Sequence, residues 1–194
     1  ASAFIARTEA AFHRDIRRIA ETIASSTDLC KVIMLAGPSS SGKTTTAHIL
    51  LDALRECGIG SQVISLDNFY KGESDAPLLE NGQHDYESVE ALNVPLLEHC
   101  LLDLMETNTC EMPVFDFENH RPHPYTRRVR FGERDIAVVE GIHALNPAIS
   151  RHLPEDGVLK IYISVKQGFE EQGEALLSPN QVRLVRRLVR DSLF

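Results

Sequence analysis

Apolar residues near the start of the chain recur at helical spacing. Phe12, Ile16, Ile19 and Ile23 are separated by four, three and four positions, so they share one face of a helix predicted over residues 3–25. We expect this face to pack on the domain that follows, with the helix as an N-terminal arm.

Short apolar runs further along the chain predict the strands of a sheet. They are rich in β-branched and other apolar residues, as buried parallel strands are, and cover residues 31–36, 61–66, 136–141 and 159–164. A helix is predicted over residues 42–57, between the first two runs. The succession of strand, glycine loop, helix and strand is typical of an α/β fold in which helices cover both faces of a mostly parallel sheet.

The middle of the chain predicts a long surface excursion and a hairpin. Residues 71–87 are polar, and loops of this length inside a compact domain are usually functional. A helix is expected over 93–105. The segments 112–117 and 126–131 are predicted to pair as strands across the His/Pro-rich stretch 119–125.

The end of the chain predicts a basic amphipathic helix that starts near Val182. Arg183, Arg186, Arg187 and Arg190 lie at i, i+3, i+4 and i+7, which gathers four guanidinium groups on one face. Such a face is either a solvated basic surface or the binding site of an anion, and mutual repulsion of the arginines favours the anion.

Composition restricts the class of protein. The 194 residues are 43% hydrophobic and 25% charged, which fits one globular domain. The formal net charge of −8 makes nucleic acid an unfavourable partner. No apolar run is long enough for a membrane span, no secretory signal is evident, and the four cysteines lack metal-site or disulfide-framework spacing. We therefore expect a cytoplasmic protein without a membrane partner, and a homo-oligomer stays open.

A phosphate-binding motif follows the first predicted strand. The segment "GPSSSGKTT" contains the complete pattern G-x-x-x-x-G-K-[ST]. The glycines let backbone N–H groups point at phosphate oxygens, and the helix behind adds its positive N-terminus. The predicted nucleotide-binding residues are Gly37, Pro38, Ser39, Ser40, Ser41, Gly42, Lys43, Thr44 and Thr45. A P-loop NTPase fold is therefore expected.

Two of the predicted roles concern Mg²⁺. The Thr44 hydroxyl is the expected ligand within the motif. Glu140 ends an apolar strand, where these folds place a second acidic group beside the ion. The alternative for Glu140 is a capping or surface glutamate.

The remaining residues favour transfer of the phosphoryl group to a second substrate over hydrolysis. The Asn-Lys-x-Asp and Asp-x-x-Gly patterns of GTPases are both absent from the chain. A small-molecule kinase needs a carboxylate to accept the proton of the attacking hydroxyl. Asp67 ends the second predicted strand and so lies at the carboxyl edge of the sheet, beside the phosphate loop.

Six ordered segments resemble a known family. "GPSSSGKTT", "ISLDNFYKG", "HDYESVEAL", "PVFDFENH", "VVEGIHALN" and "RLVRRLVRD" are similar, in order and spacing, to the uridine kinase and phosphoribulokinase family of P-loop kinases, bacterial uridine kinase-like nucleoside kinases in particular. The resemblance covers residues 12–194. It implies ATP and Mg²⁺ as cofactors and phosphorylation of a small molecule, a uridine-like nucleoside at its ribose 5′-hydroxyl.

The resemblance also implies roles for individual residues. It makes Asp67 the catalytic base that also contacts the substrate, and it makes Arg187 and Arg190 catalytic cations that approach the nucleotide phosphates. The third catalytic cation, Lys43, is expected from the phosphate-binding motif to reach the β- and γ-phosphates. The substrate-binding residues that it implies are Tyr70, Asp85, Phe115, His120 and Arg183. Structural alternatives stand beside several of them: an Asx-turn for Asp85, a surface hairpin position for His120, and packing for Phe115 and Tyr70.

The sequence departs from the family pattern in places. Gln181 stands where the family has an aspartate, and Phe115 where it has a tyrosine. The family continues past "RRLVRD", so we expect an N-terminal arm over 1–28 and a kinase domain over 29–194 that is truncated at its C-terminus. Two alternatives remain: a kinase for another small alcohol, such as a sugar phosphate or a pantothenate-like alcohol, and a non-catalytic nucleotide-binding module of a longer protein.

Overall fold

A four-stranded parallel sheet forms the centre of the molecule. The computed structural model describes residues 2–26, 30–166, 168–171 and 174–193. The strands follow the order β2-β5-β1-β6; they are β1 (Val32–Ala36), β2 (Ser61–Ser65), β5 (Ile136–Glu140) and β6 (Val158–Tyr162). Each coincides, within two residues at its ends, with one of the four apolar runs, and the predicted α/β fold with its parallel sheet is confirmed.

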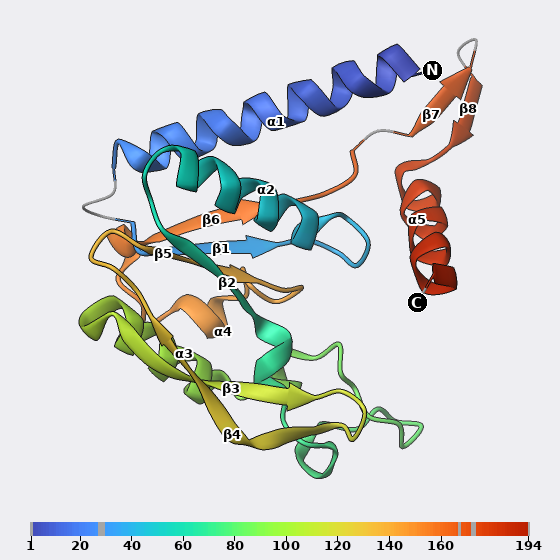
Figure 1. The fold of residues 1–194 in the computed structure, drawn as a ribbon. Helices are drawn as coiled ribbons and strands as arrows, with labels where there is room; N and C mark the ends of the chain where they lie inside the picture. The colour runs from blue at the N-terminus through green and yellow to red at the C-terminus, as the bar shows by residue number, and fades with distance from the viewer. Residues whose placement is uncertain (1, 27–29, 167, 172–173, 194) are drawn as a thin grey trace.

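Alternate residues of the central strands enter two separate cores. In β1, Val32 and Met34 pack on one face of the sheet, whereas Ile33 and Leu35 pack on the other. Helices α1 (Ser2–Ala24) and α2 (Lys43–Glu56) cover the second face, and α3 (Val94–Thr107) and α4 (Pro147–Ser150) cover the first (Figure 1). Burial on both faces explains why the two central strands, β1 and β5, are continuous apolar runs without polar alternation.

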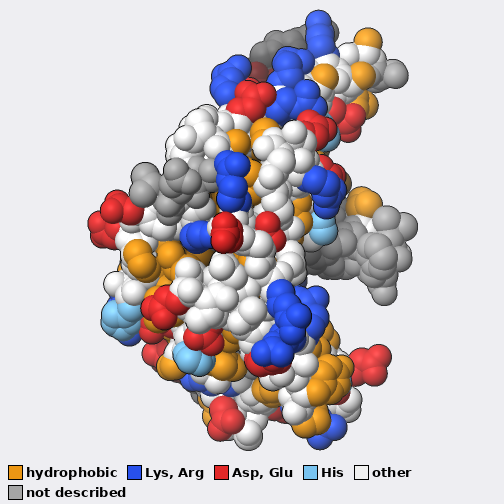
Figure 2. Space-filling view, turned by 60° about the vertical axis from the view of Figure 1, so that its left-hand side comes forward, with side chains coloured by type: hydrophobic (Ala, Val, Ile, Leu, Met, Phe, Trp, Pro, Cys, Tyr) orange, Lys and Arg blue, Asp and Glu red, His pale blue; other side chains and the backbone are white. Residues whose placement is uncertain are grey.

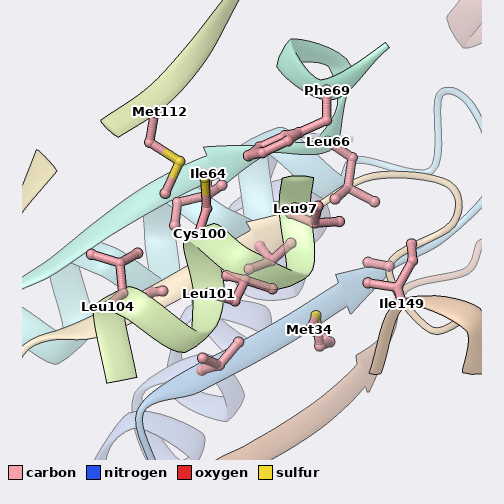
Figure 3. Close-up of a cluster of buried hydrophobic side chains, with 14 of the residues drawn as sticks. Met34, Ile64, Leu66, Phe69, Leu97, Cys100, Leu101, Leu104, Met112 and Ile149 are labelled. Atoms are coloured by element: carbon pink, nitrogen blue, oxygen red, sulfur yellow. The ribbon is translucent and has the colours of Figure 1, made fainter. Parts of the chain in front are cut away.

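The core on the α3 face is drawn in Figure 3. Leu97, Leu101 and Leu104 recur at helical spacing along α3 and face the sheet residues Met34 and Ile64. The short 3₁₀ helix η1 (Leu66–Phe69), directly after β2, adds two further side chains to the same cluster. The core therefore anchors the segment in which the chain leaves the sheet.

Helix α1 packs on α2, as its apolar face predicted, except that Phe12 of that face is exposed. Ile16, Ala20 and Ile23 are buried in the core that also contains Leu50 and Leu54 of α2. At the surface, the Arg17 guanidinium lies 3.0 Å from the Glu56 carboxylate. Exposed pairs of this kind contribute little, so the apolar contact holds the two helices together.

The predicted hairpin forms, but its strands are longer than expected. β3 (Thr109–Asp116) pairs antiparallel with β4 (Arg121–Arg130), so most of the stretch 119–125 is strand and not loop. Pro122 and Pro124 are tolerated because β4 is nearly all exposed and has β3 as its partner on one side, in a two-stranded sheet. A shift in register opposite Pro113 and Phe115 accommodates the irregular stretch.

The C-terminal part of the chain lies beside the carboxyl end of the sheet (Figure 1). A small hairpin of β7 (Phe169–Glu171) and β8 (Glu174–Leu177), which the sequence pattern did not predict, precedes α5 (Pro179–Leu193). The predicted helix is confirmed and begins three residues before Val182. Three further 3₁₀ turns complete the fold: η2 (Glu73–Asp75), η3 (Val89–Ala91) and η4 (Glu155–Gly157).

The surface mixes charged and apolar side chains. Figure 2 shows hydrophobic side chains in small patches between acidic and basic ones on the face that it presents. Within the described part of the chain, no helix combines the length and the apolar character that crossing a membrane requires.

We expect Leu101→Ala to lower the free energy of unfolding by about 2–5 kcal/mol, because the side chain is fully buried and its removal leaves a cavity. Leu78→Ala removes the same atoms from a side chain that is 62% exposed and should cost less than about 0.5 kcal/mol. Chemical denaturation of both variants measures the difference; equal losses would contradict the assignment of the α3 core.

Candidate functional site

The loop between β1 and α2 forms an uncapped helix N-terminus. Gly42 is the N-cap of α2, in a left-handed conformation with φ 98°, and as a glycine it has no side chain to cap the first turn. Ser40, two residues earlier, also has positive φ, at 59°. Backbone N–H groups at such a helix N-terminus can bind an external acceptor, and the helix dipole favours a negatively charged one.

Gly37 lies where two strand ends approach closely. A Cβ at this position would lie 2.2 Å from the carbonyl oxygen of Ile163, which follows β6. The Ile163 amide in turn donates to the carbonyl of Ala36 at 2.7 Å. The absence of a side chain therefore allows the loop to leave β1 while β1 and β6 stay paired.

Two carboxylates meet at the same edge of the sheet. β2 and β5 are parallel neighbours in which Ser65 pairs with Glu140. The Ser65 hydroxyl donates to Oε1 of Glu140 at 3.2 Å and accepts from the amide of Asp67 at 3.3 Å. One serine thus connects the end of β5 to the first turn of η1, and it contacts the carboxylate of Glu140 and the backbone of Asp67.

Burial and mutual repulsion act on these carboxylates. The pKa of Glu140 is raised, first because the side chain is desolvated and then because Asp67 is negatively charged. Desolvation also raises the pKa of Asp67, and the positive charge of Lys43 partly opposes the rise. The Asp67 side chain is reached by solvent from the cavity, but protein surrounds it on the other sides, so accessibility and desolvation coexist.

Lys43 lies between the loop and the acids. Its ammonium group donates to the carbonyl of Pro38 at 3.4 Å. Its positive charge offsets part of the rise in the pKa of both Asp67 and Glu140. From inside the phosphate loop, the Lys43 charge therefore stabilises the ionised forms of the two carboxylates.

These groups share one cavity of about 600 Å³. One part of its wall comes from the phosphate loop, namely Ser39, Ser40 and residues 42–45, together with Arg186 of α5; the predicted residues Gly37, Pro38 and Ser41 do not line it. The rest of the wall comes from the segments that follow β2 and β5 and from the tip of the β3–β4 hairpin, and its residues are Asp67, Tyr70, Tyr86, Glu87, Phe117, Glu140, Gly141 and Ile142. The volume is that of a typical small-molecule site.

Four residues outside α5 were predicted to bind the acceptor without a catalytic role: Tyr70, Asp85, Phe115 and His120. Of these, Tyr70 lies in the cavity wall. Its hydroxyl donates to the carbonyl of Tyr86 at 3.1 Å. Burial raises the pKa of Tyr70 to about 12, with further contributions from the charges of Asp67 and Glu87. Tyr70 therefore holds the loop 71–87 against the cavity while one face of its ring contacts Phe115.

The other three predicted residues lie behind this wall. Oδ1 of Asp85 accepts from the amides of Glu87 and Ser88, both at 3.1 Å, in an Asx-turn. Phe115 is 7% exposed and packs under the aromatic side chains of the wall. His120, in the hairpin turn, stacks on the outer side of Tyr86 with an interplanar angle of 26°. A second, open groove of about 370 Å³ lies on that side.

The arginines of α5 divide into two groups. Nε of Arg183 donates to the carbonyl of Ser39 at 3.4 Å, and Nη2 of Arg186 would lie 3.3 Å from a Cβ on Gly42, so both reach the phosphate loop. Arg187 is exposed and does not line the cavity. The side chain of Arg190 lies outside the described part of the structure. Arg186, which sequence reasoning placed on the basic face without a role in the site, is the arginine of the cavity wall.

Several wall residues were not predicted. Tyr86, Glu87 and Phe117 come from the polar excursion and the hairpin tip, where the sequence has no periodicity to indicate which side chains face inward. The contact residue Ser65, which lies outside the wall itself, could have been predicted from the sequence. It ends a strand just before Asp67, and the parallel neighbour of that strand ends in Glu140. Ile142 follows Glu140 and lies in the wall with its side chain 37% exposed.

The donor set suits Mg²⁺ bound mainly by a nucleotide. Thr44 and Glu140 both line the cavity and supply oxygen atoms. Among the described residues no group of three His, Cys, Asp or Glu side chains forms a metal cage. Mg²⁺ typically takes one or two protein ligands and completes its shell with phosphate and water.

Comparison with known proteins points to one family. The model of the phosphoribulokinase / uridine kinase family matches residues 32–173. A uridine kinase of Clostridium botulinum (strain Okra) is 32% identical over 160 residues, which cover 82% of this chain and 68% of the relative. A uridine kinase of Lactobacillus johnsonii is 29% identical over 161 residues, which cover 83% of this chain and 67% of the relative.

Solved structures show the same fold. A possible uridine kinase from Bacillus stearothermophilus has 25% identity and a TM-score of 0.59, and the match covers 76% of this chain and 79% of that one. A putative fructose transport system kinase from a Silicibacter species has a TM-score of 0.63 at 17% identity, over 92% of this chain and 84% of that one. The second likeness concerns the fold alone.

We expect Gly37→Ala to weaken ATP binding by at least about tenfold, because the new Cβ collides with the Ile163 carbonyl and displaces the loop. Isothermal titration with ATP measures the change. Gly72→Ala is the matched control, because its φ is −63° and the added Cβ meets only an ordinary contact at 3.6 Å. Unchanged ATP affinity in a folded Gly37→Ala variant would contradict this role of the loop.

Proposed function

Because this chain belongs to the phosphoribulokinase / uridine kinase family, we propose that it transfers the γ-phosphoryl group of ATP to the 5′-hydroxyl of a uridine-like nucleoside. One observation carries the proposal: the Asp67 carboxylate lies in the same cavity as the phosphate loop. A donor phosphate on the loop and an acceptor hydroxyl at the carboxylate fit within about 600 Å³.

Asp67 is proposed to act as the general base. Ser65 binds its backbone amide, and its raised pKa makes it a stronger base than an ordinary aspartate. The carboxylate accepts the proton of the acceptor hydroxyl as the hydroxyl oxygen bonds to the γ-phosphorus. The bond between that phosphorus and the bridging oxygen of ATP then breaks, with ADP as the leaving group.

The cations of the site are proposed to offset the charge of the transferring group. Lys43 lies inside the loop, and Arg183 and Arg186 approach it from α5. Arg187 and Arg190 of the same helix are proposed to approach the nucleotide phosphates when it is bound. Thr44 and Glu140 would hold Mg²⁺, which supplies further charge neutralisation at the β- and γ-phosphates.

The aromatic wall supports an acceptor that contains a ring. Phe117 is 59% exposed and Tyr86 is partly exposed, yet both line the cavity, where an apolar face of a ligand would cover them. Tyr70, Asp85, Phe115 and His120 are proposed as acceptor residues, the first in the wall and the others in the layer behind it.

A non-catalytic nucleotide-binding module is the second candidate. The phosphate loop would bind a nucleotide equally well in such a module. A carboxylate with a raised pKa beside that loop, as at Asp67, is however needed only for transfer. Transfer is therefore the better-supported function.

Asp67→Asn should lower kcat by at least about 10²-fold, because the amide cannot accept the proton, while the affinity for ATP changes little. A coupled assay of ADP release with uridine as acceptor measures transfer, and titration measures binding. Asp75→Asn, an exposed neutralisation outside the cavity, is the control. Unchanged turnover in Asp67→Asn would refute the catalytic assignment. An absence of transfer by the wild type to any alcohol, together with tight ATP binding, would favour the module.

The pH dependence of kcat/KM follows from the same carboxylate. Asp67 acts when deprotonated, so activity should fall as the pH decreases through its raised pKa, at a pH above the ordinary value of 3.8. The residual activity of Asp67→Asn should lack this acid limb. A limb that persists unchanged in that variant would show that another group controls it.

A further inference from the structure

The two ends of the cavity differ in charge. The positive side chains in its wall are Lys43 and Arg186, and both lie at the phosphate loop. Away from the loop, the wall combines the aromatic side chains with the carboxylate of Glu87, which has no role in the mechanism proposed above. No lysine or arginine among the described residues lines this end, so the wall there offers no counter-charge to an anionic acceptor.

The backbone around Glu87 is held on both sides. Its amide donates to Oδ1 of Asp85 at 3.1 Å, and the carbonyl of the preceding residue, Tyr86, accepts from the Tyr70 hydroxyl at 3.1 Å. These hydrogen bonds fix the turn from which the side chain reaches the cavity. Asp85 therefore acts on the wall through the position of Glu87.

Glu87 acts electrostatically at the acceptor end. Its charge and that of Asp67 both raise the pKa of Tyr70, so the phenol lies within reach of two negative groups. A phosphate brought by the acceptor to the same region would be a third negative group, and like charges at short range repel one another. An uncharged acceptor with hydroxyl groups would instead find hydrogen-bond acceptors.

Resting on the kinase function proposed above, we propose that Glu87 determines acceptor specificity: its carboxylate accepts hydrogen bonds from an uncharged polyhydroxy acceptor and repels an acceptor that already carries a phosphate. The inference separates two candidates that the sequence left open, because it favours a nucleoside over a sugar phosphate. Specificity then depends on a repulsive element as well as an attractive one.

The test compares uridine with 3′-UMP, which has the same free 5′-hydroxyl and an added phosphate. Wild type should prefer uridine. Glu87→Gln should raise KM for uridine about 3–10-fold with kcat changed less than about twofold, and should shift the preference, the ratio of kcat/KM values, at least about tenfold toward 3′-UMP. Glu87→Lys should shift the preference further, since a graded response to charge distinguishes electrostatics from a change in shape.

Glu90→Gln is the matched control, because it removes the same charge from an exposed side chain three residues away that does not line the cavity. A preference that is the same in wild type, Glu87→Gln and Glu87→Lys, or a wild type that prefers 3′-UMP, would overturn the inference and leave the role of Asp67 intact.

If wild type transferred phosphate to neither compound, the kinase proposal would fail by itself. Equilibrium binding of uridine and 3′-UMP to the protein saturated with a non-hydrolysable ATP analogue would then decide the inference. A preference for uridine that weakens in Glu87→Gln would support it, and equal affinities in both proteins would overturn it.

Discussion

Parallel pairing of β5 with both β1 and β2 is the constraint on which the candidate site depends. The register places Leu35 of β1 and Ser65 of β2 beside the same residue, Glu140. Because parallel strands end at a common edge, the phosphate loop, the serine and the two acids emerge together. A slip of one residue in β5 would move the Glu140 side chain to the opposite face of the sheet, away from Ser65.

The same edge concentrates groups that are unfavourable for stability. Asp67 and Glu140 raise each other's free energy in the charged state, and desolvation adds to it, while Lys43 and the Ser65 hydroxyl offset part of the cost. The two cores on either face of the sheet keep the edge in place. Like charges held close together by a rigid scaffold, with shifted pKa values, are typical of sites where charge develops during a reaction.

The end of the cavity proposed to bind the acceptor is built differently, from loops held by side chains. Tyr70 binds the carbonyl of Tyr86, Asn68 accepts from the amide of Phe115 at 3.3 Å, and Asp85 caps the turn at Glu87. Each contact joins η1 to the long excursion or to the hairpin, or closes a turn of the excursion. The donor end therefore depends on regular secondary structure, and the acceptor end on a few polar contacts between irregular segments.

The amino-acid sequence by itself determined the parallel sheet, the helices on its faces, the phosphate loop and the position of Asp67 at a strand end. These features are local, since they follow from apolar runs, helical periodicity and glycine spacing within a few residues. Tertiary structure alone decided that β4 extends through Pro122 and Pro124 and that Arg186 lines the cavity. It also decided that Tyr86, Glu87 and Phe117 form the part of the wall proposed to face the acceptor, while His120 stacks on Tyr86 from behind. Those outcomes depend on contacts between segments distant in the chain, for which irregular loops carry no periodic signal.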